Sequence, residues 1–315
     1  MSQSVIKASK EVLKKMEEYY KGQLKSNPPV HTLFAAKVNG CSITAYKSGK
    51  VLFQGKSHES EAMKWGHSPD KNQHSQNQSH ATPPSFVNQS HIGSDEAGSG
   101  DFFGPLTAAA AYVAESKIPL LKELGVKDSK AMSDDKIQEI AKQIKLAEIP
   151  YSLMVLHNEK YNRLQQKGWT QGKMKAMLHY HAIMKVKDRT GTNSLDGILV
   201  DQFCQPSVFE RHLKSEQKRM PDKIHFITKA ESHSIAVAAA SIIARAKFVK
   251  EMDRLSGEVG FQLQKGASKK VDEQAAKIIR SRGKQALDQY SKVHFSNYQK
   301  AEQILKLKNE QRKRK

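Results

Sequence analysis

A polar stretch in the first third of the chain limits what the sequence can fold into. Residues 66–89 consist mainly of Ser, Asn, Gln, His and Pro, and almost none of them can contribute to a hydrophobic core. A segment of this composition is typical of a flexible linker. We therefore predict an N-terminal domain at 1–65 and a larger domain at 90–315, joined by a linker at 66–89.

The net charge of the chain restricts its partners. Lys and Arg number 52 against 32 Asp and Glu, which gives a formal net charge of +20. Such an excess indicates a polyanionic partner, either nucleic acid or an anionic membrane surface. The sequence contains neither a long apolar run nor an N-terminal signal peptide, so it favours nucleic acid and predicts no membrane association.

The number and spacing of the cysteines indicate whether the protein works in a reducing or an oxidising cellular compartment. Cys41 and Cys204 are far apart in the sequence and form no Cys-x-x-Cys pair. This pattern argues against a disulfide framework and against a zinc knuckle. We therefore expect a cytoplasmic protein whose thiols are reduced.

The N-terminal domain is predicted to contain a helix followed by a small antiparallel sheet. Apolar residues at helical spacing predict a helix over residues 4–23. Three apolar runs, separated by glycine-containing turns, predict strands at 32–38, 42–46 and 50–54.

Four lysines lie on or beside this predicted sheet, namely Lys37, Lys47, Lys50 and Lys56. One interpretation is that a face of the sheet contacts the phosphates of a nucleic acid. The alternative is that these are ordinary solvated lysines at the edges of a sheet. The sequence supports the two interpretations equally.

An acidic, glycine-rich segment begins the larger domain. Asp95 and Glu96 are followed by Gly98 and Gly100, and then by an apolar run at 107–113 that predicts a buried strand. Glycines permit a bend that lets two adjacent side chains leave the strand on the same side. The two carboxylates repel each other, and a divalent cation with oxygen ligands would relieve that repulsion. The alternative is a solvated acidic turn.

Two further acids occupy comparable positions. Asp201 ends an apolar run at 195–201, and Glu231 lies between a strand predicted at 223–228 and a buried helix that begins near Ser232. Open α/β sheets place their chemistry at the carboxyl ends of core strands. The alternatives are that Asp201 caps the next turn and that Glu231 only complements a helix dipole.

A polar turn before a helix predicted at 133–146 supplies two candidate donors. Ser129 and Lys130 carry a hydroxyl and an ammonium group that can each donate to a phosphate. This assignment rests on residue type alone.

The acidic positions and the basic charge together indicate one kind of chemistry. Carboxylates at strand ends in a basic chain fit a two-metal nuclease, in which cations about 3.5–4 Å apart hold the attacking and leaving oxygens. No Cys or His cluster offers a competing nucleophile, and the chain has no Walker-type phosphate-binding loop. We therefore expect hydrolysis of a nucleic acid.

The order of these segments resembles the type 2 ribonucleases H, and among them the ribonuclease HIII branch. The run from Asp95 to Pro105 resembles the first motif of the family, and later motifs are matched at 128–130, 200–201, 229–232, 238–244 and 265–268. Glu231 stands where ribonuclease HII usually has Asp, and Gly-Ser-Gly at 98–100 where it has Gly-Arg-Gly. Ala97 and Ser99 depart from the more usual Val and Thr, which weakens any transfer of substrate contacts.

The resemblance implies a fold for each domain. The larger domain is expected to be α/β, with a ribonuclease H-like mixed five-stranded sheet and flanking helices. The N-terminal region is expected to be a small α+β, TATA-binding-protein-like domain that binds the substrate.

The resemblance also implies an activity, that of an endoribonuclease that hydrolyses the RNA strand of RNA–DNA hybrids and leaves 5′-phosphate and 3′-hydroxyl ends. Asp95, Glu96, Asp201 and Glu231 are expected to be the catalytic residues and the ligands of two Mg²⁺ or Mn²⁺ ions. One ion would activate a water, and the other would stabilise the leaving oxygen.

Further residues are implied to bind the substrate. Gly98, Ser99 and Gly100 are expected to approach the minor groove and read 2′-hydroxyl groups, which only RNA carries. Ser129 and Lys130 are expected to contact the substrate as well.

Two other functions stay open. One is ribonuclease HII-like cleavage at single embedded ribonucleotides, and the other is a non-catalytic hybrid-binding protein whose acids are structural. In the favoured interpretation the partner is an RNA–DNA hybrid, and we expect a monomer without an obligate protein partner.

Overall fold

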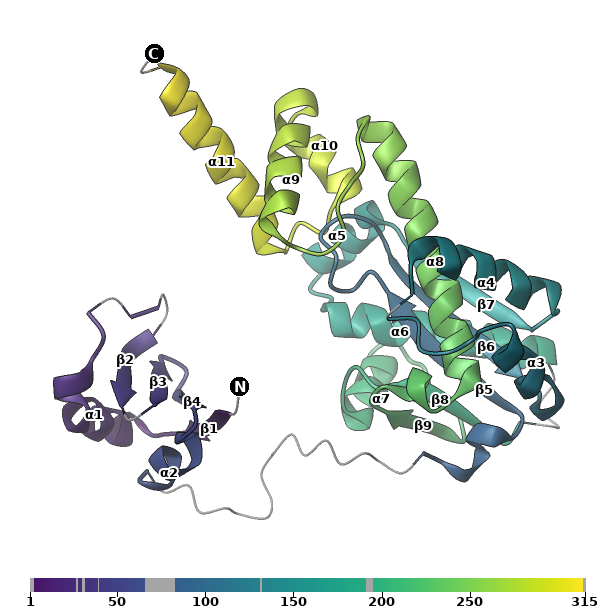
Figure 1. Cartoon of the computed structure of the whole chain (residues 1–315), viewed down its shortest axis with the longest axis horizontal. Helices are drawn as coiled ribbons and strands as arrows, with labels where there is room; N and C mark the ends of the chain where they lie inside the picture. Colours follow the sequence, from purple (N-terminus) through teal and green to yellow (C-terminus); the bar gives the residue numbers. More distant parts are fainter. Residues whose placement is uncertain are drawn as a thin grey trace. The chain divides into compact units, whose positions relative to one another are not determined.

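The computed structural model describes residues 3–26, 28–29, 32–38, 40–65, 83–130, 132–190 and 195–313, with side chains to residue 307. The chain divides into two compact units, residues 1–77 and 78–315 (Figure 1). Most of the predicted linker, residues 66–82, lies outside the described residues.

The smaller unit is a four-stranded antiparallel sheet with two helices packed on one face. The strand order is β1-β4-β3-β2. Leu13 and Met16 of helix α1 pack with Ile43 and Phe53 of the sheet to form its core. The elements are β1 (Gln3–Lys7), α1 (Lys10–Tyr19), η1 (Lys21–Gln23), β2 (Thr32–Val38), β3 (Cys41–Tyr46), β4 (Lys50–Gly55) and α2 (His58–Met63). The predicted strands are therefore confirmed.

The helix predicted over 4–23 is wrong in its first part. Residues 3–7 form strand β1, which pairs along its whole length with β4. Ile6 is buried and Val5 is half exposed, which is the alternation of a strand with one covered face. The helix begins only after Ser9, whose hydroxyl accepts a hydrogen bond from the backbone N–H of Val12.

The larger unit contains the predicted mixed five-stranded sheet. The strand order is β7-β6-β5-β8-β9, in which β7, β6 and β5 are antiparallel and β5, β8 and β9 are parallel. The strands are β5 (His91–Ala97), β6 (Leu106–Val113), β7 (Tyr151–Leu156), β8 (Gly197–Asp201) and β9 (Ile224–Ile227).

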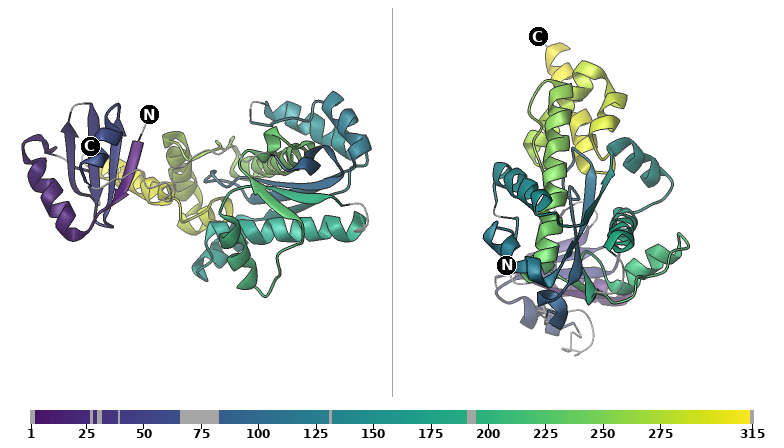
Figure 2. Two further views of the ribbon diagram at one scale, coloured as in Figure 1. Left: turned by 90° about the horizontal axis from the view of Figure 1, so that it is seen from below. Right: turned by 90° about the vertical axis from the view of Figure 1, so that its right-hand side faces the viewer.

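Helices cover both faces of this sheet, with α8 on one side and α6 on the other (Figure 2). Alternate residues of β6 divide between the two layers, since Ala109 and Ala111 pack with α8 whereas Ala108 and Ala110 pack towards α6. The helices are η2 (Ser85–Asn88), η3 (Glu115–Lys117), α3 (Ile118–Glu123), α4 (Asp134–Leu146), α5 (Asn158–Gln166), α6 (Gln171–Thr190), α7 (Pro206–Lys214), η4 (Ala230–Ser232), α8 (Ile235–Val259), α9 (Lys269–Arg282), α10 (Lys284–Tyr290) and α11 (Ser296–Lys313).

The contact between β5 and α8 is unusually close because both elements carry small residues there. A Cβ atom on Gly93 would lie 2.1 Å from the backbone nitrogen of Val237 and 2.2 Å from the carbonyl carbon of Ala236. Only glycine allows this approach. The close contact sets the distance between the sheet and the helix next to Asp95.

The end of the predicted linker belongs to the larger unit. Residues 85–88 form η2, and the ring of Phe86 is buried against Leu199 and Val237. A Cβ atom on Gly197 would lie 2.5 Å from this ring, so the ring occupies the space that the glycine leaves. Val87 packs against the same cluster, so the mainly polar segment 66–89 ends in two apolar residues that contact the larger unit.

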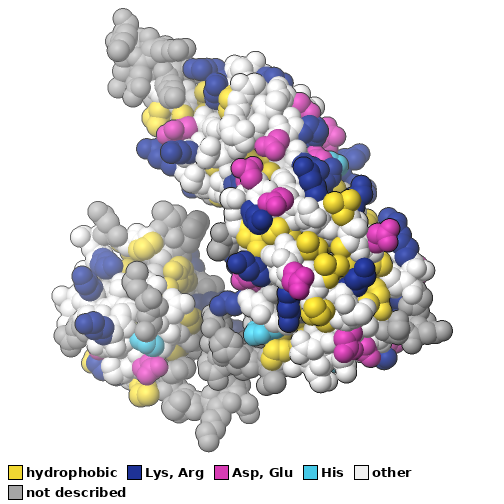
Figure 3. Space-filling model, turned by 45° about the vertical axis from the view of Figure 1, so that its right-hand side comes forward, with side chains coloured by type: hydrophobic (Ala, Val, Ile, Leu, Met, Phe, Trp, Pro, Cys, Tyr) yellow, Lys and Arg dark blue, Asp and Glu magenta, His cyan; other side chains and the backbone are white. Residues whose placement is uncertain are grey.

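The surface of the larger unit carries charges of both signs. Figure 3 shows Lys and Arg side chains spread over the face in view, with Asp and Glu side chains between them. A distributed basic excess suits an extended polyanion better than a small anionic ligand.

Candidate active site

Three of the four predicted acids lie on neighbouring strands of the larger sheet. Asp95 and Glu96 lie near the end of β5, and Asp201 is the last residue of β8. The two strands are parallel, with Ser94 opposite Val200. The next residue on each strand, Asp95 on β5 and Asp201 on β8, therefore lies at the same edge of the sheet.

Glu231 joins these residues from η4, shortly after β9. The backbone N–H of Ala230 donates to Oδ1 of Asp201 at 2.9 Å and so ties η4 to the end of β8. The Glu231 side chain is buried and forms an ion pair with Lys130 through Oε1. Its other oxygen, Oε2, is buried and accepts no hydrogen bond from the described residues.

The electrostatics show that the carboxylates affect one another. Burial raises the pKa of Asp95 well above its usual value, and the charges of Glu96 and Asp201 raise it further. Burial likewise raises the pKa of Asp201, to about 6, and Glu231 and Glu96 add to that effect. The negative charges of neighbouring acids therefore act on both Asp95 and Asp201.

Glu96 has two side-chain partners, a histidine and a lysine, both on α6. Its Oε2 lies 2.8 Å from Nε2 of the buried His179, and its Oε1 forms an ion pair with Lys175. Burial acts to raise the pKa of Glu96, but His179 and Lys175 outweigh it, so the pKa is lowered. Nδ1 of His179 lies 2.7 Å from Oγ of Ser94, which holds the ring against β5.

Sequence reasoning missed Lys175 and His179 as site residues. Their signal lay in their spacing, because residues four apart share one face of a helix. Gln171, four residues earlier, continues that face and donates through Nε2 to the carbonyl oxygen of Ser99 at 2.9 Å. One face of α6 therefore contacts the segment around Glu96 and Ser99.

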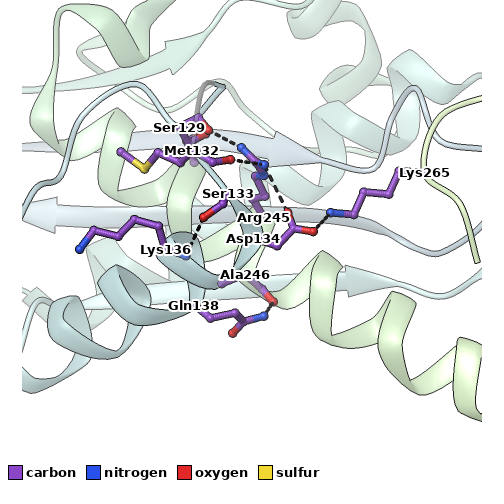
Figure 4. A network of polar contacts seen from close by, with 10 residues as sticks. Ser129, Met132, Ser133, Asp134, Lys136, Gln138, Arg245, Ala246 and Lys265 are labelled. Atoms are coloured by element: carbon purple, nitrogen blue, oxygen red, sulfur yellow. Dashed lines mark hydrogen bonds and ion pairs between the residues drawn. The ribbon is translucent and has the colours of Figure 1, made fainter. Parts of the chain in front are cut away.

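The turn that carries Lys130 is anchored by Arg245 of α8 (Figure 4). The Arg245 guanidinium donates to the carbonyl oxygens of Ser129 and Met132 and forms an ion pair with Asp134. Asp134 also pairs with Lys265. These contacts fix the turn from which Lys130 reaches Glu231.

The predicted substrate residues in this turn differ in accessibility. The Ser129 side chain is buried, and its hydroxyl lies 3.0 Å from that of Ser241. Lys130 is exposed, and its ion pair with Glu231 raises the pKa of the ammonium group. The Lys130 ammonium can therefore reach a ligand, whereas the Ser129 hydroxyl faces the protein interior.

The glycine-rich loop after β5 bends sharply at Gly98. Its φ is +86°, and a Cβ atom there would lie 2.3 Å from the carbonyl oxygen of Pro105 and 2.8 Å from the ring of Phe248. Gly100 is exposed, with no atom within 4 Å of the position of a Cβ. Gly98 is thus needed for the bend, while Gly100 offers bare backbone at the surface.

The donor set fits a hard divalent cation. All four acids offer carboxylate oxygens, and the unpartnered Oε2 of Glu231 and the repulsion on Asp95 both favour a positive charge among them. Within the described part of the chain, no three His, Cys, Asp or Glu side chains are arranged around a common ion position. Instead, Lys175 is the counter-charge of Glu96 and Lys130 is that of Glu231.

Comparisons with known proteins agree along nearly the whole chain. The Ribonuclease HII family model matches residues 92–298, and one described as Domain of unknown function (DUF3378) matches residues 3–79. A relative from Oceanobacillus iheyensis named Ribonuclease HIII is 55% identical, covering 97% of this chain and 100% of its own. The chain belongs to the ribonuclease HIII family.

Solved structures agree with this membership of the ribonuclease HIII family. The Mn²⁺ complex of Bst-RNase HIII has a TM-score of 0.67 and 42% identity, covering 97% of this chain and 99% of that chain. Aquifex aeolicus RNase H3 has a TM-score of 0.54 and 25% identity, covering 92% and 99% respectively. The chain is therefore a ribonuclease H, as predicted. Among its described residues, no helix has the length and apolar character that a membrane span requires.

Proposed function

We propose that this ribonuclease H cuts the RNA strand of RNA–DNA hybrids. Its catalytic residues would be Asp95, Glu96, Asp201 and Glu231, which would bind Mg²⁺ or Mn²⁺ as cofactor. The observation that carries the proposal is that, beyond the effect of burial, Glu96 and Asp201 raise the pKa of Asp95, and Glu231 and Glu96 raise that of Asp201, in a chain of net charge +20. The carboxylates alone would repel a phosphodiester, whereas bound cations would attract it. The expected products carry 5′-phosphate and 3′-hydroxyl ends.

The backbone and α6 orient the ligands. When bound, two divalent ions supply an activated water and stabilise the leaving oxygen. Asp95 accepts a hydrogen bond from the backbone N–H of Glu96 at 2.7 Å, and Asp201 accepts one from Ala230 at 2.9 Å. His179 holds Glu96. These contacts limit the rotamers of the ligands before any cation arrives, which lowers the entropic cost of binding.

Lys130 is proposed to bind a substrate phosphate. Its side chain is 66% exposed, while that of its partner Glu231 is 2% exposed, so the ammonium reaches inward from the surface. A cation bound to Glu231 would replace Lys130 as counter-charge and leave its ammonium available to a phosphate. Ser129 is proposed to contribute through the position of its backbone, since its hydroxyl is buried.

The loop at Gly98, Ser99 and Gly100 is proposed to select the RNA strand. The exposed backbone at Gly100 lets a nucleic acid approach closely, and a 2′-hydroxyl can both donate to and accept from backbone groups. The anchoring of Ser99 by Gln171 supports a fixed loop. DNA lacks the 2′-hydroxyl and would lose these contacts.

The smaller unit is proposed to hold the hybrid on the face of its sheet opposite α1. Strand alternation puts Lys7, Lys37 and Lys50 on that face, because Ile6, Val51 and Phe53 point into the core. All three lysines are exposed. Lys47 instead lines a groove with residues of α1.

The remaining parts of the proposal concern the state of the protein. We propose a cytoplasmic monomer without an obligate protein partner. Cys41 and Cys204 are both free, which suits a reducing compartment.

A cleavage assay tests the proposed reaction. On a uniform RNA–DNA hybrid we expect cleavage with Mg²⁺ or Mn²⁺ and none with EDTA, because the acids need cations to attract the phosphodiester. The comparison substrate is a DNA duplex with one embedded ribonucleotide. Stronger cleavage of that duplex would favour the ribonuclease HII-like alternative, and binding without cleavage would favour a non-catalytic protein.

Paired charge removal tests the role of the smaller unit. For the double variant Lys37→Gln, Lys50→Gln we expect hybrid affinity to fall about tenfold. The slope of log affinity against log salt concentration should become shallower by the amount that corresponds to the loss of roughly 1–2 phosphate contacts. The matched control is Lys10→Gln, Lys14→Gln, which removes the same charge from α1. Fluorescence anisotropy at several salt concentrations measures both. Equal losses for the two pairs would contradict a specific sheet face.

A further inference from the structure

A lysine is completely buried near the glycine-rich loop and takes no part in the proposed chemistry. Lys292 lies between α10 and α11 and is 0% exposed. Its ammonium donates to the carbonyl oxygen of Asp101 at 2.8 Å and to that of Gly104 at 2.6 Å. Burial lowers the pKa of Lys292 to about 7, while the charge of Asp101 acts in the opposite direction. Burying an ammonium group is costly, so these two contacts are its compensation.

The backbone around Lys292 pairs with the same loop. The N–H of Lys292 donates to the carbonyl oxygen of Phe102 at 2.9 Å, and the N–H of Gly104 donates to that of Tyr290 at 3.0 Å. Phe103 and Ser291 form a bridge between these contacts. Residues 290–292 therefore act as a short strand laid against residues 102–104.

A second loop holds the start of the same segment. Oδ1 of Asp101 accepts a hydrogen bond from the N–H of Gly266 at 2.6 Å, and the N–H of Phe102 donates to the carbonyl oxygen of Gly266 at 2.9 Å. The rings of Phe102 and Phe103 are buried. Residues 101–104 are thus fixed on several sides by residues from the C-terminal third of the chain.

The turn that carries Lys292 is itself fixed by Asn162 of α5. Nδ2 of Asn162 donates to the carbonyl oxygens of Asp288 at 3.0 Å and Ser291 at 2.9 Å. Its Oδ1 accepts from the N–H of Val293 at 3.2 Å. The position of Lys292 is therefore set by a side chain that does not touch the loop.

We propose that Lys292 is a positioning residue that sets the backbone of 101–104 and thereby aims Gly98, Ser99 and Gly100 at the substrate. The inference rests on the proposed role of those three residues in binding RNA. Both carbonyl oxygens point inward to one ammonium group, so the loop has one preferred path between β5 and β6. Without the ammonium, these oxygens would be buried without a donor and the loop would shift to satisfy them.

Lys292 acts on binding, since it contacts neither the four acids nor the surface. A displaced loop would misplace the groups that read the substrate while leaving the carboxylates of β5, β8 and η4 in place. Small misplacements of substrate-positioning groups have large kinetic effects. The expected signature is a raised KM with a nearly unchanged kcat.

The test is steady-state cleavage of a uniform hybrid by Lys292→Met, which keeps most of the length of the unbranched side chain and removes its donors. We expect KM to rise about tenfold and kcat to stay within about twofold, measured well below the melting temperature. Lys292→Arg retains donors and charge and should return KM to within about threefold of the parent. The control Ile278→Ala loosens the same C-terminal core, which also contains Phe102 and Phe103, but removes no hydrogen-bond donor to the carbonyl oxygens of 101–104, and should leave KM unchanged.

Each outcome decides the inference. An unchanged KM in Lys292→Met, an equal rise in Ile278→Ala, or an Arg variant no better than Met would overturn it. If Lys292→Met does not fold, Asn162→Ala decides, with a rise in KM supporting the inference and an unchanged KM defeating it. Failure of the parent to cut hybrids would defeat the proposed function instead, so the two failures are distinguishable.

Discussion

We expect Asp201→Asn to reduce cleavage of a uniform hybrid by about a thousandfold or more, which corresponds to roughly 4 kcal/mol of transition-state stabilisation. An amide is a poorer ligand for a divalent cation than a carboxylate, and the charges of both Glu231 and Glu96 act on Asp201. Hybrid affinity should stay within about threefold, because the basic residues that we propose to contact phosphates are unchanged. Single-turnover cleavage and anisotropy measure the two quantities.

The matched control for this variant is Asp196→Asn. Asp196 is exposed and lies just before the first residue of β8, whereas Asp201 is the last residue of that strand. Its substitution therefore removes the same charge far from the site. We expect cleavage within about twofold of the parent, as for most exposed substitutions. Parental activity in Asp201→Asn would show that the assigned group of acids is not the catalytic centre.

Asp201→Asn should also stabilise the metal-free protein against unfolding. The pKa of Asp201 is raised to about 6 in the folded state, so the folded state binds the proton more tightly than the unfolded state does. Protonated Asp201 therefore makes its full contribution to the free energy of unfolding below about pH 4, and that contribution is lost as the pH rises through about 6. At pH 7 in EDTA we expect Asp201→Asn to be more stable by on the order of 2 kcal/mol, with little difference at pH 4. Denaturant titrations at the two pH values measure this.

The position of each acid could be predicted because strands and their ends have strong sequence signals. Asp201 ends an apolar run and Asp95 comes just before the glycine-rich segment and the apolar run at 107–113. The parallel pairing of β5 and β8 then brings Asp95 and Asp201 to one edge. The counter-charges could not be predicted in the same way. Lys175 contacts Glu96 only because α6 packs across β6 and β7, and a helical periodicity does not specify which strand a polar side chain will meet.

The errors in the fold have a common cause. Strand β1 and the buried Phe86 are short features whose stability comes from partners far away in the sequence, namely β4 and Gly197. A five-residue strand or a single ring carries too little local pattern to be recognised. The hydrogen bonds from Lys292 to the carbonyl oxygens of Asp101 and Gly104 also depend on distant partners, because nothing near that lysine in the sequence indicates that it is buried beside 101–104.

The second large effect is expected at Gly93, where β5 and α8 meet. In Gly93→Ala the new methyl group would lie about 2 Å from the backbone of Val237 and Ala236, and backbone atoms cannot move aside as a flexible side chain can. Either β5 or α8 must shift, and the sheet must open near Asp95. We expect a loss of about 3 kcal/mol or more and a melting temperature lower by roughly 10 °C. Thermal unfolding followed by circular dichroism measures the change.

Gly257→Ala provides the control within the same helix. Gly257 lies inside α8, and no atom lies within 4 Å of the position of its Cβ, so the methyl group adds no clash. Alanine favours the helix over glycine by about 0.5–1 kcal/mol, and the control should therefore be slightly more stable than the parent. Opposite signs for the two Gly→Ala changes would show that the spacing between β5 and α8 is what requires glycine at 93. A small effect at both positions would mean that the sheet and the helix adjust freely, and the geometry of Asp95 would then not depend on their close contact.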